Sequence, residues 1–229
     1  MCTAYQFGPV ASKNRFTAKL VGLETHLRLL RPTNQAPVLL DADEVIHMRW
    51  GFARPWSKAI VNSRDDKLAT RTWSTAFEQR RCLIPMVAYY EWSGDTGKKT
   101  THRFTPNNAD HFWAAGIWED SKEHGPCFSM ITCSPNALVE PVHDRMPALL
   151  HPDQLDAYLN GHLQTFAPSP ASSTSNPPPP TPSPENPPQN NHLPLPFGSK
   201  TSFSNLPLPG FARNLFACMR IYSLHSPVP

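Results

Sequence analysis

The sequence predicts an α+β domain, in which short helices flank a mostly antiparallel β core, followed by a tail without a packed core. Apolar runs of strand length, bounded by Gly, Pro, Asn or Asp, alternate with a few stretches of helical spacing. The tail is predicted by composition, because 16 of the 27 prolines lie in 165–229. Such sequence buries too little apolar surface to offset the entropy of ordering. We therefore expect a domain over 1–164 and a disordered tail over 165–229.

In the first half of the domain, leucines three and four residues apart predict an amphipathic helix over 13–31. Short apolar runs predict strands over 38–40 and 45–50, with an acidic turn between them. A short helix is expected over 71–81, where Trp73 and Phe77 are four residues apart.

The second half of the domain has three longer apolar runs, which predict strands over 82–92, 111–120 and 126–135. The polar stretch 93–102 indicates an exposed hairpin loop between the first two of these strands. The domain closes with a helix over 151–161, which has Pro and Asp in its first turn and Gly after its end.

Charge and cysteine content limit the classes of function. The tail holds three of the 21 basic and one of the 18 acidic residues, which leaves the domain a formal charge of +1. Nucleic acid would therefore have to bind to a local patch rather than to a polycation. The chain has five cysteines without C-x-x-C spacing and no secretory or membrane-length apolar run. These features predict a protein of a reducing compartment, cytoplasmic and nucleoid-associated, that does not enter a membrane.

The chain offers few ligands for a metal ion. Cys127, Cys133 and His124 fit no zinc spacing, and Cys82 has the setting of a small buried apolar residue. We expect neither a metal nor another cofactor.

Cys2 follows the initiator Met1 directly. If Met1 is removed, Cys2 carries an amine and a thiol on adjacent carbons, a pair of nucleophiles that no internal cysteine has. An α-amino group has a pKa of about 7.7–8.0, so a useful fraction is unprotonated near neutral pH and can form an imine with an aldehyde.

Other candidate residues are weak when each is taken alone. Tryptophan is more often a buried core residue than a base-stacking one, so Trp50 and Trp56 are core residues by default. His143, beside Asp144 and Arg145, is by default a structural loop residue. Glu91 lies between Tyr90 and Trp92, where burial among aromatic rings would raise the pKa of a carboxyl group toward that of a general acid.

Taken together and in order, these stretches resemble the SRAP family, the SOS-response-associated peptidases or abasic-site processing proteins. The resemblance rests on Met-Cys at the start, WGFARPW, NSRDD, RRCLIPMVAYYEW, AAGIW and HDRMP, and it extends to about residue 163. Members of the family recognise abasic sites in single-stranded DNA and join to them covalently.

The resemblance implies a role for each matching residue. It implies that Cys2 is the nucleophile, that Glu91 is the acid/base, that His143 is a second catalytic group, and that Asn62 and Arg64 line the DNA site. In this chemistry the amine of Cys2 forms an imine with the ring-opened sugar, and the thiol then closes a thiazolidine. The imine also makes β-elimination, an AP-lyase activity, accessible.

A groove for single-stranded DNA needs aromatic faces for the bases and cations for the phosphates. The candidates for this groove, in a protein expected to act as a monomer, are Trp50, Trp56, Lys58, Arg64 and Arg71.

The sequence departs from the family pattern in three places. Ala4 stands where members have a basic residue, and Asp66 stands where they have glutamate. The Pro-rich run begins where members continue into a further segment that returns to the sheet, so the domain is expected to lack that segment.

Two other classes of function stay open at this point. Cys2 could pair with His143 in a thiol peptidase or autopeptidase. The domain could also bind single-stranded DNA without catalysis.

Overall fold

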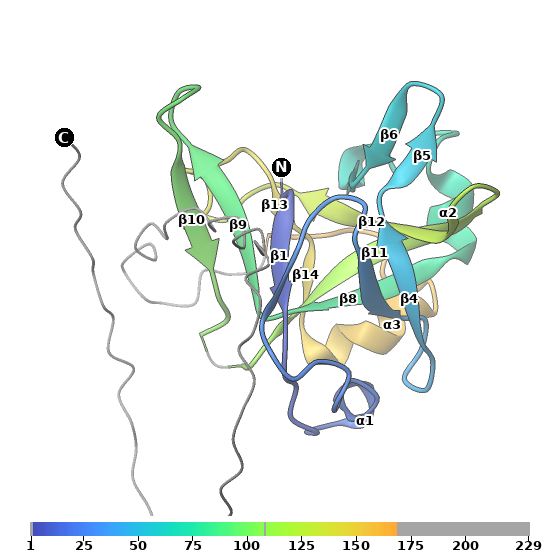
Figure 1. Cartoon of the computed structure of the whole chain (residues 1–229). Coiled ribbons are helices and arrows are strands. Elements are labelled where there is room, and N and C mark those ends of the chain that lie inside the picture. The colour runs from blue at the N-terminus through green and yellow to red at the C-terminus, as the bar shows by residue number, and fades with distance from the viewer. Residues whose placement is uncertain (1, 108, 169–229) are drawn as a thin grey trace, which may run out of the picture. The chain divides into compact units, whose positions relative to one another are not determined.

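Two β-sheets form the body of the protein in a computed structural model that describes residues 2–107 and 109–168 (Figure 1). The smaller sheet has four antiparallel strands. In spatial order they are β10 (Thr100–Phe104), β9 (Ala88–Ser93), β1 (Ala4–Phe7) and β2 (Arg28–Leu30).

The larger sheet has eight strands and closes on itself, because β12 pairs both with β11 and with β4. Its pairings are antiparallel except where β12 runs parallel to β4 and to β7. The strands are β3 (Gln35–Leu39), β4 (Val45–Trp50), β7 (Asn62–Arg64), β8 (Arg81–Met86), β11 (Phe112–Ser121), β12 (Gly125–Cys133), β13 (Met146–Pro147) and β14 (Leu149–Leu150).

A separate hairpin and several short helices complete the fold. The hairpin projects beyond the closed sheet in Figure 1. Its strands are β5 (Phe52–Arg54) and β6 (Ser57–Ile60), and the helices are α1 (Arg15–Ala18), α2 (Ser74–Gln79), α3 (Leu155–Leu159) and the 3₁₀ turns η1 (Asp65–Lys67) and η2 (Pro152–Gln154). The predicted fold class is confirmed: a mostly antiparallel β core with short helices.

The predicted helix over 13–31 is wrong beyond its first turn. An Asn14 capping box begins α1, but the helix ends at Ala18, and Gly22 beyond it adopts a φ of +79°, a left-handed conformation that does not continue a helix. Leu30 instead pairs with Tyr5 in the smaller sheet. Leu27 is 59% exposed, so the leucine spacing did not mark one buried face.

The other predicted elements are confirmed with two differences. The run 82–92 is two strands rather than one, because the chain leaves the larger sheet at Met86 and enters the smaller sheet at Ala88. The final helix begins as a 3₁₀ turn at Pro152 and ends before Gly161, which has a positive φ. The stretch 93–102 is the turn of the β9–β10 hairpin, which is exposed, together with the start of β10, where Thr101 is buried.

Arg81 and Tyr158 hold the end of the domain to the larger sheet. The guanidinium of Arg81 donates to the carbonyls of Tyr158 (3.1 Å) and Leu163 (2.6 Å), and the hydroxyl of Tyr158 donates to the carbonyl of Gly116 (2.5 Å). Phe166 then packs against Phe77 and Tyr158. The packed part of the chain therefore reaches at least Phe166, past the predicted boundary at 164.

The predicted disordered tail lies almost entirely outside the described residues. The expected absence of the family's last segment concerns that same part of the chain. Among the described residues, none of the helices is long and apolar enough to cross a membrane.

Replacing Phe166 with alanine should lower the free energy of unfolding by about 1–2 kcal/mol. Truncation of a fully buried Phe to alanine costs about 3–5 kcal/mol, and the ring of Phe166 is only half-buried. Urea unfolding of the whole chain measures this change. Thr165→Ala is the matched control, since Thr165 is exposed. Equal stability of both variants would return the boundary to 164.

Candidate functional site

The pairing of β1 with β9 brings Cys2 close to Glu91. Ala4 lies opposite Tyr90, and the antiparallel register continued by one residue puts Thr3 opposite Glu91. Both candidate side chains are buried, with exposed fractions of 0% for Cys2 and 1% for Glu91. Two predicted site residues that are 89 positions apart in sequence are thus neighbours in the fold.

Asn62 connects this pair to the larger sheet. It begins β7, which runs parallel to β12, and its side-chain Nδ2 donates to the carbonyl oxygen of Cys2 at 2.8 Å. Asn62 is 8% exposed, and its Oδ1 has no hydrogen-bond partner within residues 2–107 and 109–168. The contact fixes the backbone of Cys2 and leaves one buried acceptor at the site.

The thiol of Cys2 is protonated at neutral pH. Burial raises its pKa far above the ordinary value, and the charge of Glu91 raises it further. The Sγ donates to the carbonyl of Ala4 at 3.4 Å. A resting thiolate, which a thiol peptidase uses, is disfavoured by these surroundings.

Glu91 is poised to give or take a proton. Burial raises the pKa of its carboxyl group to about 7, and the negative charge of Asp144 acts in the same direction. At neutral pH both protonation states are populated, as a general acid/base requires.

His143 lies in the loop that joins β12 to β13. The backbone N–H of Arg145 donates to its Nδ1 at 3.0 Å, and a carboxylate oxygen of Asp144 lies 2.8 Å from the same nitrogen. These contacts are alternatives, because Nδ1 accepts in the first and must donate in the second. Burial lowers the pKa of His143, which favours the neutral form of the ring.

An ion pair that the sequence did not reveal holds this loop. Arg145 and Asp65 approach to 2.5 Å, with side chains 8% and 23% exposed. Arg145 lies within the HDRMP stretch, so the motif carried a signal, but its partner 80 positions away could not be inferred without the fold.

The residues predicted to contact DNA fall into three groups. Trp56 is 74% exposed at the turn of the β5–β6 hairpin, and Lys58 and Arg71 are also exposed. Arg64 is exposed but its guanidinium forms two contacts with Asp66, of 2.9 and 3.0 Å. A phosphate would have to share Arg64 with that carboxylate.

Trp50 does not belong to a DNA-binding surface, which corrects the prediction. It is fully buried, and its ring meets Tyr5 edge-on at 4.9 Å and stacks on Phe128 at 6.3 Å. Its indole N–H donates to the carbonyl of Val61. The ring of Trp50 therefore lies between the two sheets and supports β1 from the core.

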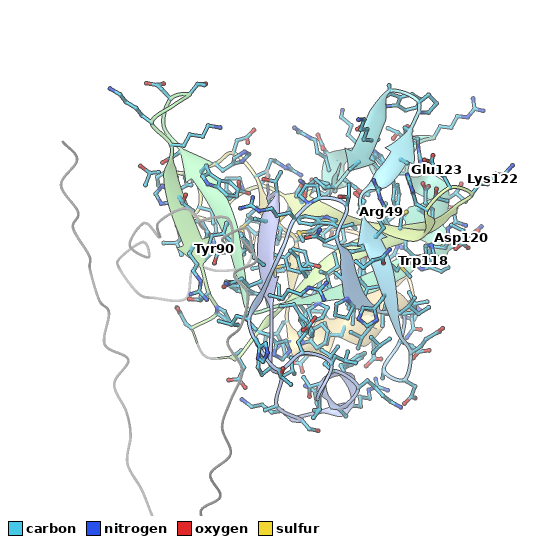
Figure 2. All side chains as sticks on the ribbon, in the orientation of Figure 1. Arg49, Tyr90, Trp118, Asp120, Lys122 and Glu123 are labelled. Carbon is cyan, nitrogen blue, oxygen red and sulfur yellow. The ribbon has the colours of Figure 1, made fainter. Side chains whose placement is uncertain are left out.

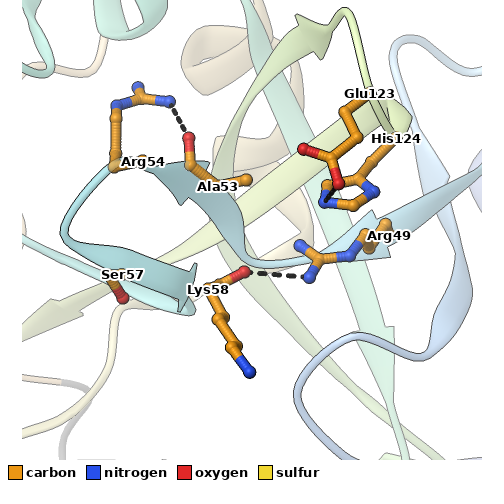
Figure 3. Close-up of a pocket in the computed structure, with 7 residues that line it drawn as sticks. All are labelled: Arg49, Ala53, Arg54, Ser57, Lys58, Glu123 and His124. Atoms are coloured by element: carbon orange, nitrogen blue, oxygen red, sulfur yellow. Dashed lines mark hydrogen bonds and ion pairs between the residues drawn. The ribbon is translucent and has the colours of Figure 1, made fainter.

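A cavity of about 300 Å³ lies under the β5–β6 hairpin (Figure 3). It is lined by Arg49, Ala53, Arg54, Ser57, Lys58, Glu123 and His124. The Arg49 guanidinium donates to the carbonyls of Gly51 and Lys58, and Arg54 pairs with both carboxylate oxygens of Glu119. Both guanidinium groups already have partners within the protein. They therefore stabilise the hairpin that carries Trp56 rather than bind a ligand.

The cavity is separate from the Cys2 site. Arg49 lies opposite Cys127 on β12, whereas Asn62 lies opposite Met130, about 10 Å further along at the usual rise of a strand. The neighbouring β11–β12 turn has mixed charge, since Asp120 and Glu123 lie near Lys122 in Figure 2.

Glu91 should make the protein less stable as the pH rises. Its pKa is about 7 when folded and near the ordinary 4.5 when unfolded, so the folded chain binds more protons between these values. The free energy of unfolding should fall over that range by about 3 kcal/mol relative to Glu91→Gln. Urea unfolding at pH 5 and pH 8 measures the difference, with the exposed Glu78→Gln as control. Parallel pH profiles of wild type and Glu91→Gln would contradict the shift.

Comparison with solved structures shows the same fold in bacterial proteins. A protein from Bordetella bronchiseptica is matched with a TM-score of 0.59 at 21% identity, over 74% of this chain and 95% of that chain. A protein from Bacteroides thetaiotaomicron gives a TM-score of 0.58 at 20% identity, over 71% and 82% of the two chains.

Sequence comparison finds relatives that are named for the processing of abasic sites. The abasic site processing protein YoqW of Bacillus subtilis is 31% identical over 125 residues, 49% of this chain and 56% of that protein. The yeast protein YMR114C is 28% identical over 144 residues (57% and 39%), and HMCES of Gallus gallus is 27% identical over 168 residues (54% and 50%).

The chain spans little more than half the length of the Bacillus relative. The sequence profile of the family described as SOS response associated peptidase (SRAP) matches residues 23–180, which is more than half of the chain. The motifs predicted Cys2, Asn62, Glu91 and the HDRMP stretch as site residues. The fold that contains them is shared with solved bacterial structures. The chain belongs to the SRAP family.

Proposed function

We propose that this protein processes abasic sites in single-stranded DNA by forming a covalent bond through Cys2. The observation that carries the proposal is the placement of Cys2, its carbonyl held by Asn62, beside a carboxyl group whose pKa is near neutrality. Relatives named abasic site processing proteins support the substrate.

The chemistry begins with the amine that Cys2 acquires when Met1 is removed. The amine attacks the aldehyde carbon of the ring-opened sugar, and the carbonyl oxygen leaves as water after it accepts protons, one of them from Glu91. The thiol then adds to the imine carbon: sulfur forms the new C–S bond and the thiol proton ends on nitrogen. The product is a five-membered thiazolidine, in which no atom is oxidised or reduced.

A protonated thiol fits this order of events. Because burial keeps Cys2 in the thiol form, the amine is the stronger nucleophile at neutral pH and attacks first. The same feature argues against a thiol peptidase, which needs a thiolate for its first step.

A lyase reaction follows from the same imine. Loss of a proton from the adjacent sugar carbon expels the 3′ phosphate and cleaves the strand by β-elimination. In this proposal Glu91 and His143 are the bases near the imine, and closure of the thiazolidine competes with elimination.

The DNA strand is proposed to contact the exposed side chains of Trp56, Lys58 and Arg71. Trp56 offers an exposed aromatic face on a hairpin that Arg54 ties to Glu119. Such stacking tolerates any base, which suits a protein that has to recognise a missing one.

Cys2→Ser should abolish the stable adduct while leaving an amine that borohydride can trap as a Schiff base. Incubation with an abasic single-stranded oligonucleotide, followed by intact mass measurement, reports both the adduct and the removal of Met1. An oligonucleotide without the abasic site is the control. Reversible binding alone by the wild type would favour the non-catalytic alternative.

A bulky residue inserted between Met1 and Cys2 separates the two nucleophiles. It hinders removal of Met1 and keeps the nitrogen of Cys2 in a peptide bond, so the thiazolidine should not form although the thiol remains. A heat-stable adduct from this variant, with Met1 retained by mass, would exclude the aminothiol mechanism and favour thiol chemistry.

Trp56→Ala should weaken the binding of undamaged single-stranded DNA roughly 5- to 150-fold, the equivalent of about 1–3 kcal/mol for one stacked base. Fluorescence anisotropy measures the dissociation constant. Trp56→Phe keeps an aromatic face and should recover most of the affinity. Equal affinity of Trp56→Ala and the wild type would place the strand elsewhere.

A further inference from the structure

The face of the smaller sheet that carries Glu91 runs from the core toward solvent. Residues directly opposite each other in an antiparallel pair share a face, as do residues two positions apart on one strand. Tyr89 lies opposite Phe104, and their rings stack at 4.9 Å in the core. Nearer the hairpin turn, which projects from the body in Figure 1, Glu91 lies opposite His102, and Ser93 follows on the same face. His102 and Ser93 are half-buried, so burial decreases along this face toward the turn.

The two ring nitrogens of His102 have different surroundings. Nε2 lies 2.8 Å from the hydroxyl oxygen of Ser93. Nδ1 is buried and has no hydrogen-bond partner within residues 2–107 and 109–168, an arrangement that costs free energy and is rare without a functional reason. Burial lowers the pKa of His102, so the ring is neutral at neutral pH and one of its nitrogens can accept a proton. The ring thus connects a buried position to a half-exposed hydroxyl.

His102 is within reach of a carboxyl group that solvent hardly touches. The side chain of Glu91 is 1% exposed. Residues directly opposite each other in an antiparallel pair have Cβ atoms about 4.5–5.5 Å apart, so the carboxyl and the imidazole can meet directly or through one water. An imidazole can accept a proton on one nitrogen and release the proton of the other, so it transfers protons without being consumed.

The other titratable groups near Glu91 do not offer the same route. The Cys2 thiol and the Tyr89 hydroxyl are buried, and burial raises the pKa of both, so neither exchanges protons readily near neutral pH. Burial and then the charge of Asp144 raise the pKa of Glu91, but a carboxylate is ordinarily a weaker base than an imidazole. His143 is a second neutral imidazole, but in the proposed function it acts at the sugar.

We propose that His102, together with the hydroxyl of Ser93, passes protons between the carboxyl group of Glu91 and solvent. In the outward direction the O–H bond of the carboxyl group breaks and an N–H bond forms at Nδ1. Nε2 then gives its proton to the oxygen of Ser93, whose own proton passes to water, and the inward direction reverses these steps. This inference deepens the proposed function and rests on it for the effect on rate.

The first test needs no DNA. In long-range ¹H–¹⁵N NMR of the full chain, the ring nitrogens of His102 should respond to the titration of Glu91, with an apparent pKa of about 7. This step should disappear in Glu91→Gln. The internal control is the exposed His26, whose Nε2 also lies near a hydroxyl, that of Thr25 at 3.4 Å. Its titration should be the same in both proteins.

The second test measures the single-turnover rate of adduct formation with an abasic single-stranded oligonucleotide. His102→Gln keeps a polar partner for Ser93 but carries no transferable proton. It should slow the reaction roughly 10-fold, which is less than the roughly 10²–10⁴-fold effect of a group that acts on the substrate directly. In His102→Ala, added imidazole should restore part of the rate. His26→Gln should leave the rate unchanged with and without imidazole.

The two tests separate this inference from the proposed function. A wild type that forms no adduct refutes the function, while the NMR titration still decides whether His102 is coupled to Glu91. A His102 signal that does not respond to Glu91 overturns the inference. A folded His102→Gln protein with the wild-type rate does the same, and so does a slow His102→Ala protein that imidazole fails to restore, since a purely structural ring would behave in that way.

Discussion

The hydrogen bond from Asn62 to the carbonyl of Cys2 joins the two sheets at the point on which the site depends. Cys2 precedes β1 in the smaller sheet, and Asn62 begins β7 in the larger one. The strand that follows Cys2 is held in the smaller sheet by its pairing with β9 and with β2. The T-shaped packing of Tyr5 on Trp50 supports the same junction from the core.

The closed part of the larger sheet supports this junction through β12. This strand pairs with β11 on one side and with β4 on the other, and β7 pairs with β12 beyond the end of β4. Asn62 begins β7 and Arg145 directly precedes β13, so both residues are anchored to β12. A site made of short loops thereby gains fixed geometry.

The sequence predicted the strands whose apolar pattern reflects burial, such as Val45–Trp50, and the candidate residues that lie in its motifs. It misplaced Leu23 and Leu27, which have helical spacing but are exposed, since spacing does not report what a residue packs against. It assigned Trp50 to DNA because a motif reveals residue type and not direction. The Asp65–Arg145 pair depends on tertiary structure alone and had no local signal.

The electrostatics of the site have one common cause, the burial of groups that would otherwise be charged. Burial raises the pKa of the Cys2 thiol, raises that of Glu91 to about 7 and lowers that of His143. All three shifts favour neutral forms near neutral pH. We infer that such a site suits a reaction in which a neutral amine attacks first and protons pass between neighbouring groups. A thiolate–imidazolium pair would instead require the buried thiol to lose its proton, against both its burial and the charge of Glu91.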